Sequence, residues 1–253
     1  MGDGVQHLLG PADPDVLDSV SPRPDEPFDP RAFLRASGTM FLLGMASETS
    51  PTAGLVSAFI EDVVTTARRL AAASPGARLD PPLGLVLDEA ANYPLPSLSG
   101  LMSEGGGNGI CTLVVLQSLA QARDRWGRER AQAIWDAATI KVVLGGQANT
   151  DDLTDMSRLL GEVEVRDTSQ SYGHGGQQST TVTSRSKPIL TPAQLCTLPF
   201  GMGVLLLRSA PPIMLALDAW TGRPDAATLS AEKTRLEECL RAAVHTDGDD
   251  PGA

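Results

Sequence analysis

Residues 83–89, LGLVLDE, give the clearest indication of the fold of this protein. Residues 83–87 are apolar or glycine with no polar alternation, and the run ends in Asp88 and Glu89. Such a run is typical of a strand that is buried on both faces of a parallel sheet. Ligands of these sheets bind beyond the carboxyl ends of the strands. The sequence therefore predicts a buried strand with two acids at a binding edge.

Similar apolar runs on either side of this stretch alternate with segments of helical spacing. Strands are expected near 39–43, 83–88, 111–117 and 139–144. The intervening segments repeat apolar residues every three or four positions, as amphipathic helices do. These segments are residues 55–70, 97–104, 119–137 and 150–160. Alternating strands and helices predict an α/β fold, a parallel sheet with helices on both faces.

The pattern changes after residue 161. Residues 162–172 and 178–187 are rich in Thr, Ser and Val and flank a Gly-rich tip, which predicts a polar β-hairpin. Two further apolar runs, 204–208 and 213–217, flank an Ala-Pro-Pro turn and predict a closing β pair. The C-terminal part of the domain is therefore expected to be antiparallel.

Proline content and charge divide the chain into three expected regions. Residues 1–36 combine six prolines with many acids and are expected to be a disordered tail. Residues 37–228 form the expected globular part, and residues 229–253 a short helix with a disordered acidic tail. The net charge is −11, but residues 31–228 hold eighteen acids and sixteen bases. A near-neutral domain argues against strong autonomous binding of nucleic acid, which needs a basic surface.

Cysteine and histidine usage excludes several classes of site. The three cysteines and three histidines are scattered singly, which argues against a disulfide framework or a zinc site. No basic segment followed by an apolar stretch opens the chain, and no apolar run reaches the roughly 18 residues of a membrane span. We therefore expect a cytoplasmic protein without a membrane segment in this chain, which partners could hold at the inner face of the membrane.

Asp88, Glu89 and Gln117 are the candidate site residues. Asp88 could hold Mg²⁺ through a water, and Glu89 could orient or deprotonate an attacking water. Gln117 ends the neighbouring strand and could read the γ-phosphate or that water. The apolar strand that ends in Asp88 and Glu89 is the Walker B arrangement. Two acids after a strand are more commonly a solvated strand end or a helix cap, so the pattern alone leaves both interpretations open.

The glycine run at residues 105–109 is not interpreted as a phosphate loop. A phosphate loop leads from a strand into a helix and carries a Lys for the β- and γ-phosphates. This run leads from a helix into a strand and contains no Lys. The chain has only Lys141, Lys187 and Lys233, and none lies in a GxxxxGK[ST] context. The sequence therefore contains no Walker A.

The helix expected after Gln117 carries a cluster of arginines at positions 123, 125, 128 and 130. One of them could act as an arginine finger on the nucleotide of a neighbouring subunit. More often such a cluster is a charged helix face, here paired with Asp124 and Glu129. We favour the charged face.

Residues 83–127, 134–165 and 186–206 together resemble the C-terminal half of type IV secretion coupling proteins of the TraD/TraG class. Order and spacing agree over about residues 38–220, and the variant looks actinobacterial. The resemblance implies a RecA-like, P-loop NTPase-type fold of the FtsK/HerA branch. By position, Asp88 and Glu89 match the Walker B acids and Gln117 matches the sensor Gln. No residue is matched to the arginine finger of the family.

The resemblance also implies ATP and Mg²⁺ as cofactors, hexamers with other coupling-protein subunits, and delivery of relaxase-bound DNA or secreted proteins to a channel. Complete members carry N-terminal membrane helices, a Walker A segment and an all-α insertion before the matching region. None of these is found in residues 1–253. The chain could be a gene fragment, a split half whose partner supplies Walker A, or a degenerate paralogue.

These observations lead to two hypotheses about the function of this chain. The first is a partial motor ATPase domain of a conjugative coupling protein, with Walker B and the sensor Gln, inactive in ATP hydrolysis by itself. The alternative is a non-catalytic interaction or regulatory module that binds intact coupling-protein subunits. An unrelated metal enzyme that uses Asp88 and Glu89 is disfavoured, because no nucleophile or histidine accompanies them.

Overall fold

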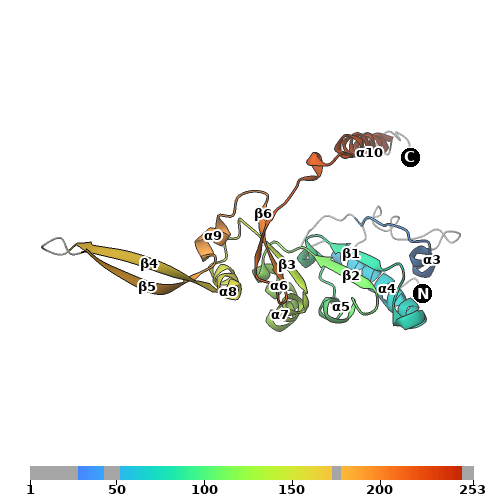
Figure 1. Cartoon of the computed structure of the whole chain (residues 1–253). Coiled ribbons are helices and arrows are strands. Elements are labelled where there is room, and N and C mark those ends of the chain that lie inside the picture. The colour runs from blue at the N-terminus through green and yellow to red at the C-terminus, as the bar shows by residue number, and fades with distance from the viewer. Residues whose placement is uncertain (1–27, 43–51, 173–177, 247–253) are drawn as a thin grey trace. The chain divides into compact units, whose positions relative to one another are not determined.

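A computed structural model describes residues 28–42, 52–172 and 178–246 (Figure 1). Most of the two expected tails, residues 1–27 and 247–253, lies outside the described residues. Just before residue 37, Pro30–Arg35 form the short helix α3, which Asp29 caps by accepting a 2.8 Å hydrogen bond from the Arg31 N–H. The described residues fall into two compact units. The first runs to Ile140 and includes Gln147–Met156, and the second comprises Lys141–Gly146 and the chain from Ser157.

The first unit is built around one pair of parallel strands, β1 (Leu83–Leu87) and β2 (Ile110–Val114). Their register runs from Leu83 opposite Ile110 to Leu87 opposite Val114. Both strands lie where the apolar runs predict them. The helices of this unit are α4 (Thr52–Ala72), α5 (Leu98–Glu104), α6 (Leu119–Trp126) and α7 (Arg128–Ala137), with short 3-10 turns η1 (Pro75–Ala77) and η2 (Ala90–Asn92).

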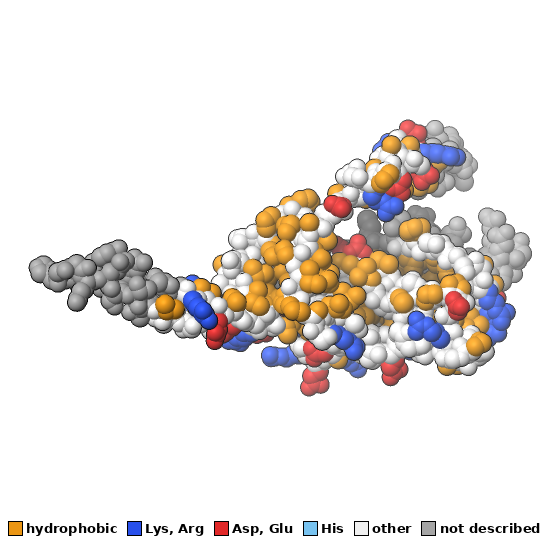
Figure 2. Space-filling model, viewed as in Figure 1, with side chains coloured by type: hydrophobic (Ala, Val, Ile, Leu, Met, Phe, Trp, Pro, Cys, Tyr) orange, Lys and Arg blue, Asp and Glu red, His pale blue; other side chains and the backbone are white. Residues whose placement is uncertain are grey.

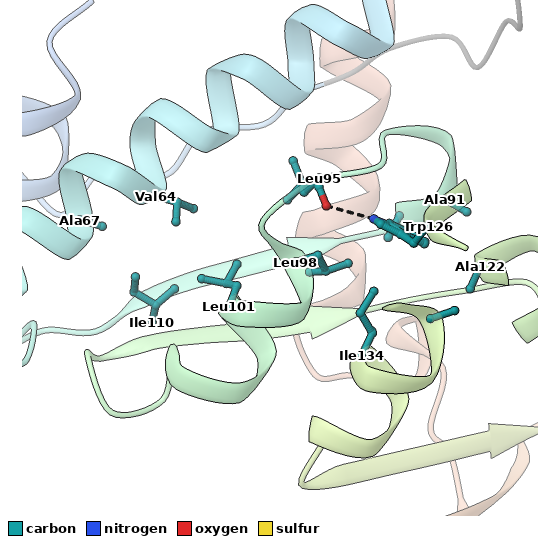
Figure 3. Packing of buried hydrophobic residues seen from close by; sticks show 12 residues of the cluster. Val64, Ala67, Ala91, Leu95, Leu98, Leu101, Ile110, Ala122, Trp126 and Ile134 are labelled. Carbon is teal, nitrogen blue, oxygen red and sulfur yellow. Dashed lines mark hydrogen bonds between the residues drawn. The ribbon is translucent and has the colours of Figure 1, made fainter. Parts of the chain in front are cut away.

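One hydrophobic cluster holds this unit together (Figure 3). It gathers buried residues of β2 and of all four longer helices, and Leu98 and Leu101 of α5 lie at its centre with at most 1% of their surface exposed. The indole Nε1 of Trp126 donates a 3.0 Å hydrogen bond to the Leu95 carbonyl, so the aromatic ring is buried without an orphaned polar atom (Figure 3). The low aromatic content is thus offset by close packing of Leu, Ile, Val and Ala.

The two faces of the β1–β2 pair differ in burial. Leu85, Leu87 and Val114 pack against the hydrophobic cluster. Val86 and Leu113 are opposite each other on the other face, and they are 71% and 56% exposed. Within the described residues this second face, which we call the open face, therefore lacks the helical cover that the sequence predicts. The α/β class itself is confirmed.

Adjacent positions of β1 should consequently differ in their effect on stability. Leu85→Ala removes a side chain that packs on the cluster and should lower the free energy of unfolding by about 2–3 kcal/mol. Val86→Ala removes a side chain that is already in water and should change it by less than about 0.5 kcal/mol. Urea unfolding of the two variants checks this, and equal losses would mean that the open face is covered in the isolated chain.

Two further expectations are corrected by the structure. Residues 39–42 form no strand, and Phe41 is 84% exposed; an apolar run becomes a strand only where a neighbour completes its hydrogen bonds. The helix expected over 119–137 is two helices, because Gly127 between α6 and α7 has φ +80°, a value outside the helical range.

The second unit contains a three-stranded sheet in the order β3 (Ile140–Leu144), β6 (Met202–Leu207), β7 (Ile213–Ala216). β6 and β7 are antiparallel, which confirms the closing β pair. β3 was expected beside β1 and β2, but its ladder partner is β6. Helix α8 (Thr150–Leu160) leads from the first unit into the second.

The polar hairpin is also confirmed. β4 (Glu162–Tyr172) and β5 (Gln178–Pro188) pair antiparallel along their whole length, and residues 173–177 of the tip lie outside the described residues. The remaining elements are α9 (Pro192–Cys196), η3 (Trp220–Gly222) and α10 (Ala226–Thr246). None of the helices in the described ranges combines the length and apolar character needed to cross a bilayer.

Candidate functional site

The carboxyl ends of β1 and β2 meet in a short network of backbone hydrogen bonds. The Val115 N–H donates to the Leu87 carbonyl at 2.9 Å, and the Ala90 N–H donates to the Val115 carbonyl at 3.1 Å. Val115 therefore bonds to the chain on both sides of Asp88 and Glu89. Gln117 follows two residues later, so the structure places all three candidate residues at the same edge of the sheet, as the parallel pairing predicts.

Glu89 lies at the centre of this edge. Its Oε1 accepts a 3.0 Å hydrogen bond from Nε2 of Gln117, and its Oε2 accepts a 2.7 Å hydrogen bond from Nδ2 of Asn92. The backbone of Glu89 is left-handed, with φ 47° and ψ 44°. A non-glycine residue in this region carries about 1–3 kcal/mol of strain, and such strain is concentrated at functional sites. Each carboxylate oxygen thus accepts one amide hydrogen bond, and the residue lies on a strained turn.

Asn92 is the residue of this site that the sequence interpretation missed. It ends the 3-10 turn η2 that begins after Glu89, and its backbone N–H donates to the Glu89 carbonyl at 2.8 Å. Side chains three residues apart eclipse each other in a 3-10 turn. The available signal was an amide residue three positions after the second acid, which a tight turn brings back onto that acid.

Asp88 is exposed, and its Oδ1 accepts a 3.1 Å hydrogen bond from the backbone N–H of Glu89. Across the described ranges, no three His, Cys, Asp or Glu side chains gather in a way that could hold a metal ion by themselves. A divalent cation at this edge would therefore take most of its ligands from elsewhere, such as water and a phosphate.

The glycine run leads from α5 to β2, as expected, and its role is structural. Gly105 caps α5, and its carbonyl accepts a 2.8 Å hydrogen bond from the Ile110 N–H. Gly109 has φ +77°, and its Cα lies so close to the backbone of Leu79 that a Cβ would come within 2.7 Å of the Leu79 carbonyl oxygen. The run is thus a tight turn that packs one loop against another.

The arginine cluster includes one partly buried ion pair. Nη2 of Arg123 lies 2.6 Å from Oδ1 of Asp152, a side chain that is only 4% exposed, whereas the Arg123 side chain is 35% exposed. Arg125 approaches Asp124 at 3.9 Å on the surface. Arg123 therefore has a partner within its own chain, and the Asp124 pairing agrees with a charged helix face.

Removing the two partners of this pair should have unequal effects. Arg123→Ala leaves a buried carboxylate without its counter-ion and should cost about 3 kcal/mol of stability. Asp152→Ala leaves an arginine that can turn into water, and it also removes the buried oxygen Oδ2, which has no hydrogen-bond partner; we expect a loss of about 1 kcal/mol. Urea unfolding of both variants checks the order, and a larger loss for Asp152→Ala would contradict it.

Comparisons with known proteins agree on one family. The family profile described as "TraM recognition site of TraD and TraG" matches residues 82–200, which include Asp88, Glu89, Asn92 and Gln117. No curated protein sequence matches the chain significantly.

Solved structures of a bacterial conjugative coupling protein, TrwB, are also similar. The unbound monoclinic form of TrwBΔN70 is 24% identical with a TM-score of 0.61, and the match covers 76% of this chain and 43% of that one. Its trigonal form with sulphate is 25% identical with a TM-score of 0.52, covering 66% and 37%. TrwB in complex with the GTP analogue GDPNP is 25% identical with a TM-score of 0.50, covering 65% and 36%.

The chain matches less than half of the length of these TrwB structures. The likeness confirms the fold class, and the profile match over residues 82–200 is independent of it. The resemblance that the sequence motifs suggested is thereby confirmed, and residues 82–200 of this chain belong to the TraD/TraG class of conjugative coupling proteins.

Proposed function

We propose that this chain is a partial motor ATPase domain of a conjugative coupling protein, which supplies the Walker B acids and the sensor Gln of a nucleotide site but no Walker A. The observation that carries the proposal is the contact between Glu89 and Gln117 at the carboxyl edge of a parallel strand pair. Glu89 orients or deprotonates the attacking water, and Gln117 reads the γ-phosphate. Both roles require the two side chains to share one edge, and they do.

The residues present fit a water-bridged Mg²⁺ and a nucleotide. Mg²⁺ keeps several waters and is commonly held by one or two carboxylates together with substrate phosphates. Asp88 supplies one exposed carboxylate at the strand end, next to Glu89. When bound, the ion would neutralise charge on the phosphates. Nucleotide complexes are known for TrwB, with GDPNP in one solved structure.

Residues 1–253 supply no glycine loop with a Lys to hold the β- and γ-phosphates. Helix N-termini and backbone amides of such a loop provide most of the phosphate cradle. We therefore expect this chain to depend on a second polypeptide segment with a Walker A sequence. The family resemblance implies that the partners are other coupling-protein subunits. Together they would deliver relaxase-bound DNA or secreted proteins, at the inner face of the membrane.

The test is hydrolysis of ATP by the purified chain, alone and mixed with a Walker A-bearing coupling protein. We expect no turnover by the chain alone, and turnover above that of the partner alone in the mixture. Phosphate release measures the rate, and a fluorescent ATP analogue measures binding. Turnover by the chain alone at the usual rate of a motor, with contamination excluded, would show that an unrecognised phosphate loop exists.

A specific observation also favours the alternative, an interaction module without catalysis. The open face of β1–β2 exposes apolar side chains, and so does the sheet of the second unit, where Val142 and Leu144 are both 48% exposed. Figure 2 shows hydrophobic side chains gathered where Figure 1 labels β3 and β6. Exposed apolar patches of this kind are typical of protein–protein contacts. Such a module would bind intact coupling-protein subunits and modulate them.

The open face offers a direct test of this alternative. Val86→Ser together with Leu113→Ser should leave the melting temperature within a few degrees of wild type, because both side chains are exposed. The same change should weaken association with coupling-protein subunits at least 10-fold if the open face is the contact. Analytical ultracentrifugation of mixtures measures the association, and unchanged binding would exclude this face.

A further inference from the structure

Glu89 is held by two amide side chains that reach it from different elements. Asn92 belongs to the same tight turn as Glu89, whereas Gln117 follows the neighbouring strand β2. Asn92 donates to Oε2 at 2.7 Å, and Gln117 donates to Oε1 at 3.0 Å. Each oxygen of the carboxylate thus has one amide donor. The orientation of the carboxylate plane is therefore defined by two contacts and not by one.

The two donors differ in how firmly they are tied to Glu89. The Asn92 backbone N–H also donates to the Glu89 carbonyl, at 2.8 Å. Side chain and backbone of Asn92 therefore both bond to Glu89, within one tight turn. Gln117 has a longer side chain and shares with Glu89 only the side-chain contact at 3.0 Å.

From this arrangement we propose that Asn92 is the positioning residue of Glu89, which holds its carboxylate in place while Gln117 is free to exchange partners. The proposal rests on the proposed function, in which Gln117 turns towards a γ-phosphate. When Gln117 leaves, Oε1 becomes open to a water, and the bond from Asn92 to Oε2 keeps the carboxylate from rotating. A carboxylate oxygen accepts from more than one side, so Oε1 can bind that water while Oε2 keeps its bond from Asn92.

Asn92 should matter for orientation and not for stability. Asn92 is only partly buried, and Glu89 and Gln117 are exposed. Water can replace a lost hydrogen bond at an exposed site, so such a bond contributes little to the free energy of unfolding. Variants of Asn92 should therefore remain folded, which makes the position of Glu89 measurable by itself.

The first experiment uses the ¹⁵N-labelled chain without nucleotide. The side-chain amide signals of Asn92 and Gln117 are assigned from Asn92→Leu and Gln117→Leu. In Asn92→Leu, which keeps the size but removes the donor, we expect the Gln117 amide signal to move most of the way to its position in Glu89→Ala. Asn92→Asp should do the same, because a carboxylate cannot donate and repels Glu89. Asn108→Leu, in the glycine turn, is the matched control and should leave the signal in place.

A merely space-filling Asn92 predicts the opposite result. The Gln117 signal of Asn92→Leu would then coincide with that of the wild type, and the proposal would be overturned. A Gln117 signal that does not respond to Glu89→Ala would overturn it as well, since the contact that both amides share would then be absent in solution.

The second experiment measures turnover in the mixture with a Walker A-bearing coupling protein. We expect Asn92→Leu to lower kcat about 10-fold with an unchanged KM, as loss of an oriented base does, and Asn92→Gln to recover part of it. If Glu89→Gln abolishes the turnover added over that of the partner alone while Asn92→Leu leaves this added turnover unchanged, the positioning role is wrong and the proposed function stands. If no mixture turns over, the proposed function fails, and the amide signals still decide whether Asn92 holds Glu89.

Discussion

Gly109→Ala should destabilise the first unit by about 3 kcal/mol or more, whereas Gly106→Ala, three residues earlier in the same run, should be close to neutral. At Gly109, φ is +77°, a backbone conformation that costs an L-residue about 1 kcal/mol. A Cβ there would also lie 2.7 Å from the carbonyl oxygen and 2.8 Å from the nitrogen of Leu79. These are backbone atoms, which cannot turn aside as a flexible side chain can.

The shift needed to admit this Cβ would affect the start of the parallel pair. The Gly109 carbonyl accepts a 2.9 Å hydrogen bond from the Leu83 N–H, and the Asn108 carbonyl accepts a 3.0 Å bond from the Leu79 N–H. At Gly106 a Cβ would meet no heavy atom within 4 Å. Urea unfolding of the two alanine variants measures the difference, and equal stabilities would contradict the packing assigned to Gly109.

The parts of the fold that were predicted correctly depend on local pattern. The apolar run at 83–87 predicted β1, and the rule that parallel strands end at one edge of a sheet predicted that Gln117 lies near Glu89. The hairpin followed from the polar β-prone runs 162–172 and 178–187 on either side of a Gly-rich tip. In each case the signal lies within the segment or in its nearest neighbour along the chain, so one sequence was sufficient.

The parts that were wrong depend on partners that lie far away in the sequence. The run at 39–42 has the composition of a strand, but strand formation needs a neighbouring edge, and composition does not specify one. The same limit explains the position of β3. Its apolar pattern suits a place beside β1 as well as its actual place beside β6. The break at Gly127 was detectable, because a glycine within a helical pattern lowers its stability by roughly 1 kcal/mol.

The candidate site likewise combines residues that local pattern predicts with contacts that it does not predict. The two acids and Gln117 were identified as candidates because each follows a predicted strand, and this pattern alone left a solvated strand end as the other interpretation. Asn92 was missed because its role depends on a 3-10 turn with a left-handed Glu89 before it, and no periodicity indicates such a turn. The partly buried pair of Arg123 with Asp152 was missed for a different reason, since the two residues are on different helices.

The largest effect on activity is expected for Glu89→Gln in the mixture with a Walker A-bearing coupling protein. An amide keeps the size of the side chain but cannot take up a proton. The turnover that this chain adds to that of the partner alone should therefore fall 10²- to 10⁴-fold, the usual contribution of a general base. Nucleotide affinity should stay within about 3-fold, because the phosphates and not Glu89 account for most of the binding. Phosphate release and fluorescent nucleotide titration measure the two quantities.

Asp88→Asn should distinguish the role of Asp88 in Mg²⁺ binding from the role of Glu89 as a base. It removes the negative charge next to the proposed Mg²⁺ site and should weaken the Mg²⁺-dependent part of nucleotide binding, which a titration with and without EDTA isolates. Glu104→Gln, at the end of α5 in the same unit, is the matched control and should change neither the turnover nor the Mg²⁺-dependent part of nucleotide binding.

Unchanged turnover in Glu89→Gln would mean that Glu89 takes no part in the chemistry. Its contacts with Asn92 and Gln117 would then be only those of a capped strand end, and the interaction module would become the better account of this chain.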